Sequence, residues 1–281
     1  MARLFMKLYY VLSIPVSLFF LLQSRRIHPA YKLTWFKRMA FGLRAVRNKH
    51  RVQTGNSYKT ALAMSMKLFE LSPDVLGDVV ECGTWKGGTA ATLSLACQIV
   101  GRKLIVCDSF EGLPPGDALD REAHIYQPGD YCGTFDEVRR NITNYGDIDR
   151  CEFVKGWFQD TLPHFDRQIV MAFFDVDLEA SINTCILNLW PLLDNQGYVF
   201  IDEYVGLDYC ALFYSERFWK EHFNRTPPGL IGAGTGLALG EFYIGPWDER
   251  DDHPMQHATG AAYTRKSMSG VWTYFPQDAT S

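Results

Sequence analysis

The first 69 residues of this chain contain no aspartate or glutamate, although the whole sequence has 32 acidic and 28 basic residues. Thirteen of the lysines and arginines lie in that acid-free part, so the net charge of −4 hides a cationic N-terminal region and an anionic remainder. A basic block of this kind is typical of contact with nucleic acid or with an anionic membrane. The composition, 47% apolar, excludes a disordered, collagenous or disulfide-rich protein.

The apolar run near the N-terminus is too short to cross a bilayer as a straight helix, which needs about 20 residues. It covers the fifteen uncharged, mostly apolar residues from Leu8 to Leu22, and Pro15 in its middle weakens a regular helix. No small-residue cleavage site follows it, which favours a retained membrane anchor over a cleaved signal. We therefore predict that residues 1–50 are an anchor and basic arm that contact a membrane and not nucleic acid. If the run does span the membrane, the heavier basic flank after it places the main domain on the cytoplasmic side. A buried N-terminal helix is the alternative.

Cysteine pairs with metal-ligand spacing are also absent. The seven cysteines are odd in number, and several lie in apolar runs that resemble strands or helices. These features favour reduced, buried thiols over disulfides or a zinc module.

Strand-like and helix-like segments alternate in the second region, residues 51–281, which we predict to be one α/β domain. Strands are predicted at 78–81, 103–108, 151–154, 169–175 and 197–202, and helices at 57–69, 87–100, 134–145 and 182–189. This alternation indicates a mostly parallel, doubly wound sheet. Near the C-terminus we expect an aromatic-rich helix over 210–223, a glycine-rich loop at 232–236 and closing strands near 237–244 and 258–265.

The first predicted strand is followed by a glycine turn that lacks the GxGxxG spacing of dinucleotide sites. The turn reads Glu81-Cys-Gly83-Thr-Trp-Lys-Gly87-Gly88-Thr89. Gly83 permits a tight turn, and the glycine pair allows close approach of a ligand where the helix begins. An acidic residue before such a turn suits a ligand with an amino-acid part, whereas a plain strand–helix turn is the alternative. Asp108 ends the second strand, where a carboxylate can accept hydrogen bonds from ribose hydroxyls, so a nucleoside ligand is favoured.

Four acidic residues follow two of the apolar strands. Asp175 and Asp177 come after one strand, and Asp202 and Glu203 come after the next. The carboxyl ends of neighbouring parallel strands meet at one sheet edge, so we expect these carboxylates to converge there. Unpaired, they would repel one another, and oxygen ligands suit Mg²⁺ or Mn²⁺ better than zinc. Solvent-facing loop acids are the alternative.

Five ordered motifs resemble the TylF/MycF family of macrocin-type O-methyltransferases. They are VECGTWKGG (80–88), CDSFEGLP (107–114), GWFQDTLP (156–163), DVD (175–177) and IDEY (201–204). The resemblance implies a Rossmann-like class I methyltransferase that methylates sugar hydroxyls with S-adenosylmethionine and Mg²⁺. It assigns the metal ligands to Asp175, Asp202 and Glu203, and the general base to Asp177. It assigns the S-adenosylmethionine site to Glu81, Gly83, Thr84, Trp85, Gly88, Thr89, Asp108, Ser109, Gly156, Trp157 and Phe158.

The sequence departs from this family at three places. Lys86 replaces the usual arginine, Glu203 replaces a second aspartate, and the run Asp175–Ser181 lacks the family's tyrosine. The expected acceptor is therefore a small hydroxyl compound that contains a sugar: an antibiotic-type glycoside, a surface glycan or a lipid-linked sugar. The alternative is a membrane-associated protein that binds S-adenosylmethionine or another nucleoside without catalysis, and an NAD-dependent oxidoreductase is a weaker third interpretation. Neither the acceptor nor the oligomeric state is fixed by the sequence, and a homo-oligomer is compatible with it.

Overall fold

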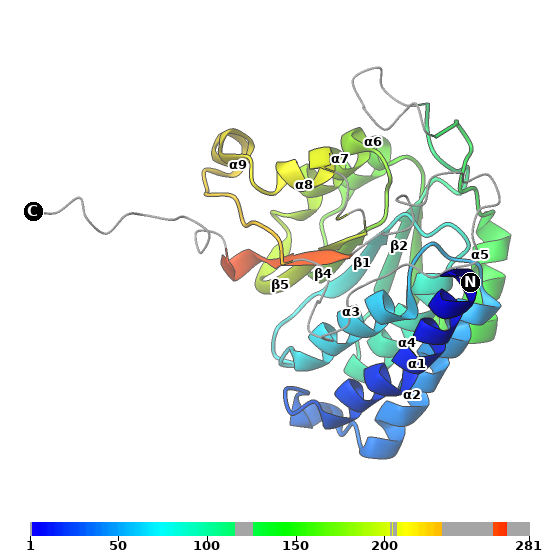
Figure 1. The fold of residues 1–281 in the computed structure, drawn as a ribbon. Helices are drawn as coiled ribbons and strands as arrows, with labels where there is room; N and C mark the ends of the chain where they lie inside the picture. The colour runs from blue at the N-terminus through cyan, green and yellow to red at the C-terminus, as the bar shows by residue number, and fades with distance from the viewer. Residues whose placement is uncertain (1, 116–125, 203, 205–206, 232–260, 269–281) are drawn as a thin grey trace, which may run out of the picture.

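The computed structural model describes residues 2–115, 126–202, 204, 207–231 and 261–268, which form a layered α/β fold (Figure 1). Its centre is a six-stranded sheet with the order β3-β2-β1-β4-β5-β6. The first five strands are parallel, and β6 runs antiparallel to β5. The strands are β1 (Asp78–Cys82), β2 (Leu104–Asp108), β3 (Cys151–Lys155), β4 (Ile169–Phe174), β5 (Leu193–Ile201) and β6 (Ala262–Arg265).

Helices cover both faces of this sheet, as Figure 1 shows, which confirms the predicted doubly wound architecture. One apolar core lies beneath α1 (Ala2–Gln23), α2 (Trp35–Arg51), α3 (Tyr58–Glu70), α4 (Gly88–Val100) and α5 (Phe135–Tyr145). The other lies beneath α7 (Glu179–Leu189), α8 (Leu207–Leu212) and α9 (Glu216–Phe223), and α6 (Phe158–Thr161) contacts α7. Short 3-10 turns are η1 (Pro29–Tyr31), η2 (Ile148–Arg150), η3 (Leu162–His164) and η4 (Lys266–Met268).

Local sequence explains these elements. All six residues of β4 are buried, as expected for a central parallel strand that is apolar on both faces. The predicted helix starts at Ser57 and Thr134 are confirmed, because each hydroxyl accepts a backbone N–H of the first turn: Lys59 N at 3.1 Å and Glu137 N at 3.3 Å.

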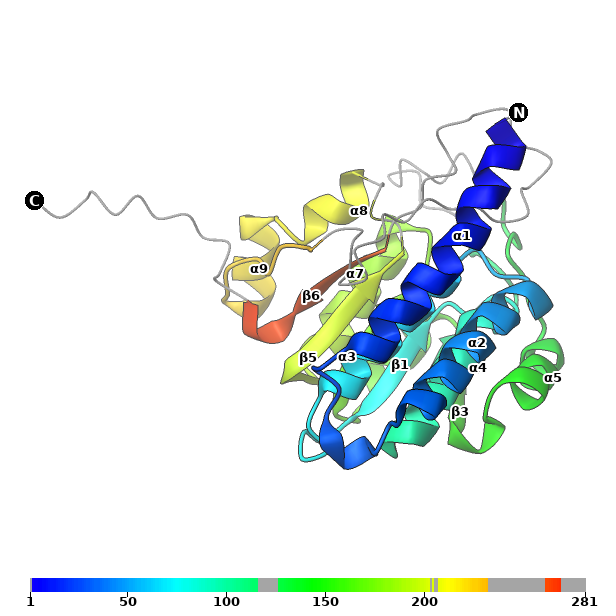
Figure 2. The same ribbon diagram turned by 60° about the horizontal axis from the view of Figure 1, so that its bottom comes forward.

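The N-terminal run forms one continuous helix, α1, which contains Pro15 on its exposed side. That Pro15 weakens this helix stays a prediction. The opposite side of α1 packs on the domain: Leu21 is fully buried, and the Ser13 and Ser17 hydroxyls lie 2.8 and 3.1 Å from the Tyr58 hydroxyl. Figure 2 shows α1 beside α2 on the outside of this helical layer.

Arg38 of α2 fixes the end of α1, since its guanidinium donates to the carbonyls of Leu22 (2.9 Å) and Ser24 (2.7 Å). In the part of the chain that the structure describes, no helix has the length and apolar character needed to cross a membrane. One face of α1 is thus packed on the domain, as the alternative of a buried N-terminal helix expected, and the other face is exposed. The predicted boundary at residue 50 between the arm and the domain stays a prediction.

The C-terminal elements differ from the prediction in one respect. The single helix expected over 210–223 is two helices, α8 and α9, because Ser215 caps a new helix by accepting the Phe218 N–H at 3.3 Å. The closing strand near 258–265 is confirmed as β6. The expected strand near 237–244, the loop at 232–236 and Glu203 lie outside the described residues. The seven cysteines, all within the described residues, form no disulfide. Cys82, Cys97, Cys107 and Cys185 are buried as predicted, whereas Cys132 is exposed.

Candidate active site

The carboxyl ends of four strands meet where the strand order reverses, because β1 has β2 on one side and β4 on the other. This is the position at which open α/β sheets bind ligands. Backbone hydrogen bonds continue the ladder beyond the strand ends: Gly83 N to Cys107 O (3.0 Å), Asp175 N to Cys82 O (3.0 Å), Asp202 N to Phe174 O (3.1 Å) and Gly156 N to Asp108 O (2.9 Å). The predicted site segments are therefore held together by the sheet itself.

The turn after β1 requires glycine at two positions. Gly83 has a φ of +80°, and a Cβ atom there would stand 1.9 Å from the Asp175 carbonyl oxygen. Gly88 starts α4, and a Cβ there would stand 2.7 Å from the Thr54 side chain. The glycines thus let the turn lie directly against the segment after β4 and the segment before α3.

Glu81 is fully buried at the end of β1. Its Oε2 accepts a hydrogen bond from the Thr84 hydroxyl at 2.9 Å, but its Oε1 has no hydrogen-bond partner among the described residues. Burial raises the pKa of Glu81 well above its usual range, against the effect of the Thr84 hydrogen bond. A buried carboxyl oxygen without a partner is costly, so this atom fits a ligand that donates a hydrogen bond, such as an ammonium group.

Asp108, at the end of β2, is held by two backbone donors. Its Oδ2 accepts the Thr84 N–H at 2.7 Å, and its Oδ1 accepts the Phe110 N–H at 2.6 Å. Burial raises its pKa, and these hydrogen bonds act in the opposite direction. This fixed carboxylate has about four acceptor sites in all, so it can still accept from the hydroxyls of a ribose.

The remaining residues predicted for the donor site lie in the segments that follow β1, β2 and β3. Trp85 has a φ of +45°, and its ring lies edge to face with Tyr131 at 5.4 Å. Ser109 closes its own turn by donating to Gly112 O, and Gly156 has a φ of +143°. Thr89 is buried in the first turn of α4, and Trp157 and Phe158 are half-buried where α6 begins.

Two of the four predicted acidic residues occupy neighbouring strand ends. Phe174 pairs with Ile201 in the β4–β5 ladder, so Asp175 and Asp202 are the next residues of adjacent strands. Burial, and then the charge of Asp202, raise the pKa of Asp175 well above its usual range. Like charges that raise a pKa in this way fit a site that receives a cation.

Asn56 and Lys49 also belong to this site, although the sequence pattern did not indicate them. The Asn56 amide donates to Asp175 Oδ2 at 2.6 Å, while its own Oδ1 is buried without a partner among the described residues. Lys49 donates to Thr54 O at 2.5 Å, and burial lowers its pKa to about 8 although the charge of Asp202 acts against that shift. No sequence signal could have found these two residues, because a lone lysine or asparagine on a helix or loop carries no motif.

Asp177 lies two residues after Asp175 with a φ of +55°, an uncommon conformation for a non-glycine residue. Within the described ranges, which omit Glu203, no three histidine, cysteine, aspartate or glutamate side chains are grouped to hold a metal. The described carboxylates at this edge, those of Asp175 and Asp202, offer the hard oxygen ligands that Mg²⁺ and Mn²⁺ prefer. These residues therefore fit an oxygen-ligated divalent cation.

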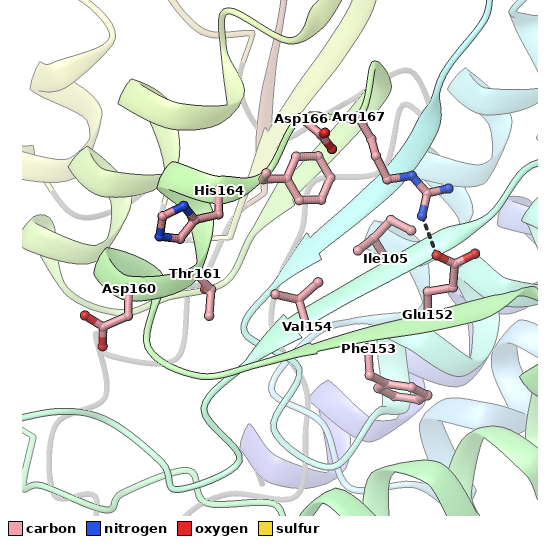
Figure 3. Close-up of a pocket in the computed structure, with 10 residues that line it drawn as sticks. Ile105, Glu152, Phe153, Val154, Asp160, Thr161, His164, Asp166 and Arg167 are labelled. Carbon is pink, nitrogen blue, oxygen red and sulfur yellow. Dashed lines mark hydrogen bonds and ion pairs between the residues drawn. The ribbon is translucent and has the colours of Figure 1, made fainter.

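A pocket of about 440 Å³ lies elsewhere, between β3 and the α6–η3 segment (Figure 3). Arg167 pairs there with Glu152 and also with Asp78. None of the predicted site residues lines this pocket, so it is separate from the site at the strand ends.

Fold and site together define a class I S-adenosylmethionine-dependent methyltransferase fold. The solved structure of the O-methyltransferase NovP superposes with a TM-score of 0.58 at 25% identity, over 92% of this chain and 99% of that one. Residues 64–228 match the family model of macrocin O-methyltransferase (TylF), and the chain belongs to that family.

Two curated relatives support the assignment. A tetracenomycin-C 4'-O-methyltransferase from Streptomyces olivaceus, whose substrate name includes a dimethoxy-rhamnosyl group, is 35% identical over 150 residues, which is 50% of this chain. Demethyldecarbamoylnovobiocin O-methyltransferase from Streptomyces niveus is 35% identical over 148 residues, or 49% of this chain. The matches span 57% and 56% of those relatives' own lengths.

Proposed function

We propose that this protein transfers a methyl group from S-adenosylmethionine to a hydroxyl of a small, sugar-containing acceptor, with the help of a divalent metal. The observation that carries this proposal is the convergence of two carboxyl pairs at one sheet edge. Glu81 and Asp108 flank the glycine turn, and Asp175 and Asp202 follow the next two strands. The first pair suits a nucleoside linked to an amino acid, and the second suits a cation beside it.

The donor would be held by the residues around the glycine turn. Asp108 would accept the ribose hydroxyls, because its carboxylate is fixed by Thr84 and Phe110. Glu81 would accept from the ammonium group through its unpartnered Oε1. Gly83 and Gly88 would let the donor approach the backbone, and the sulfonium of the donor supplies an electrophilic methyl carbon.

Methyl transfer needs an acceptor oxygen in line with that carbon and a group that takes its proton. The acceptor oxygen would form the new C–O bond as the S–C bond of the donor breaks, and Asp177 would take the hydroxyl proton. Asp175, Asp202 and Glu203 would hold Mg²⁺ or Mn²⁺, which when bound lowers the pKa of a hydroxyl ligand. Asn56 would keep Asp175 oriented through its 2.6 Å hydrogen bond.

The acceptor class follows from the relatives. The substrate name of the Streptomyces olivaceus enzyme carries a rhamnosyl group, which supports a sugar hydroxyl as acceptor here. Antibiotic-type glycosides, surface glycans and lipid-linked sugars are the candidate acceptors. We retain the prediction that the catalytic domain lies in the cytoplasm with residues 1–50 at a membrane, and the exposed apolar side of α1 supports it.

The test is methyl transfer from labelled S-adenosylmethionine to glycoside acceptors, with and without metal chelator. Activity should require Mg²⁺ or Mn²⁺. Asp177→Asn should lower the rate by roughly 10²–10⁴-fold, the usual contribution of a general base, while donor binding by calorimetry is unchanged. Glu203→Asp should keep more activity than Glu203→Ala. Full turnover in excess chelator, with Asp177→Asn as active as the parent, would contradict both the metal and the base.

A further inference from the structure

The exposed side of α1 is apolar, and the side that faces the protein is partly polar. Leu8, Val11, Leu12, Val16 and Phe19 are between 42% and 59% exposed. Their spacing of three or four residues places them on one face of the helix, together with exposed Pro15. We call these six residues the α1 stripe.

Contacts on the buried face of α1 explain why its apolar side points outward. Ser13 and Ser17, at most 4% exposed, direct their hydroxyls to Tyr58, and Ser17 also donates to the Ser13 carbonyl at 2.9 Å. A Cβ atom on Gly42 of α2 would stand 2.4 Å from Leu18, so the two helices pack closely. These contacts prevent α1 from rotating to hide the α1 stripe, which is therefore at the surface of the part of the chain that the structure describes.

Exposed basic residues follow the α1 stripe along the chain. Arg25 and Arg26 follow α1 directly and are exposed, as are Lys32 and Lys37, and no acidic residue precedes Glu70. Trp35 and Phe36, exposed at the start of α2, lie edge to face at 5.3 Å. Apolar side chains flanked by lysine, arginine and exposed aromatic rings are typical of helices that lie in the interface of an anionic membrane.

We propose that the α1 stripe is a docking surface for an anionic lipid bilayer, on which α1 lies in the plane of the interface rather than across it. No described helix is suited to crossing, and α1 is tied to α2 and α3 from Ser13 to its C-terminal end. A second copy of this chain fits less well. A two-fold dimer through the α1 stripe would bring two acid-free basic regions together, and like charges at close range repel.

The test is flotation of the full-length protein with phosphatidylcholine vesicles that contain or lack phosphatidylglycerol. The parent should float with the anionic vesicles, less so at raised salt, and weakly with phosphatidylcholine alone. Combining Leu12→Gln, Val16→Gln and Phe19→Gln should weaken partitioning at least about a hundredfold. Leu76→Gln, at a 68% exposed leucine outside the α1 stripe, is the matched control and should change nothing.

A second variant, Arg25→Gln with Arg26→Gln, keeps the α1 stripe and should reduce binding only to anionic vesicles. Calorimetry with S-adenosylmethionine and thermal unfolding are measured on every variant, so loss of fold or of donor binding is distinguished from loss of membrane binding. The proposal is overturned if the parent ignores anionic vesicles, or if the triple glutamine variant floats as well as the parent. A parent that is dimeric without lipid, does not float and becomes monomeric on the same substitutions would assign the α1 stripe to a second copy.

Discussion

Replacing Gly83 by alanine should separate backbone strain from steric overlap at the candidate active site. Gly101 is the matched control, since it has nearly the same φ (+76° against +80°) but open space where a Cβ would stand. An alanine in this conformation costs about 1–2 kcal/mol, and reduced freedom of the unfolded chain returns about 0.4–1 kcal/mol. Gly101→Ala should therefore lower the free energy of unfolding by roughly 1 kcal/mol.

Gly83→Ala carries the same strain and an overlap in addition. Its Cβ would stand 1.9 Å from the Asp175 carbonyl oxygen, well inside the 3.0 Å that real contacts keep, so backbone must move. Overpacking of this kind costs about 1–3 kcal/mol more, which gives a total of about 2–4 kcal/mol. Equilibrium urea unfolding measures both values, and calorimetry should show weaker S-adenosylmethionine binding for Gly83→Ala alone. Equal loss of stability in the two variants would refute the close approach of the glycine turn to Asp175.

Three further predictions concern the same site. Asp108→Ala should weaken S-adenosylmethionine binding at least about tenfold in calorimetry, because the ribose loses a charged acceptor, and unchanged affinity would contradict its role. Asn56→Ala should lower activity about 10–100-fold and raise the Mg²⁺ concentration needed for half-maximal rate, because a metal ligand loses its hydrogen bond. An unaltered Mg²⁺ dependence would count against the role of Asn56 in orienting Asp175. The pKa of Asp175 is raised in the folded state, so its contribution to stability is present below the usual aspartate pKa and is lost as the pH rises through the raised value. Without metal, Asp175→Asn should accordingly have a higher Tm than the parent at neutral pH, and this difference in Tm should be smaller near about pH 4. A lower Tm than the parent at neutral pH would show instead that the ionised carboxylate stabilises the fold.

Much of the fold follows from local sequence. The apolar segments that become β1, β2, β4 and β5 are read from residues adjacent in the chain. The acidic residue is the last of β2, directly follows β4 and β5, and is the last but one of β1. Helix starts at Ser57 and Thr134 depend on one side chain and the following turn. Because carboxyl ends of parallel strands share one edge, the sequence alone predicted that Asp175 and Asp202 would be neighbours.

Tertiary structure decided which other residues reach that edge and which side of α1 faces outward. Asn56 bonds to Asp175 across 119 positions of the chain, and Lys49 approaches Asp202 only because α2 packs beside α4. Hydrophobic periodicity predicts that the apolar side of a helix faces the core, but in α1 the serine side does, since Tyr58 offers buried hydrogen bonds and Gly42 admits close packing. Neither partner can be inferred from the sequence of α1 itself, because the free energy that orients a helix depends on the complementary groups that distant segments present to it.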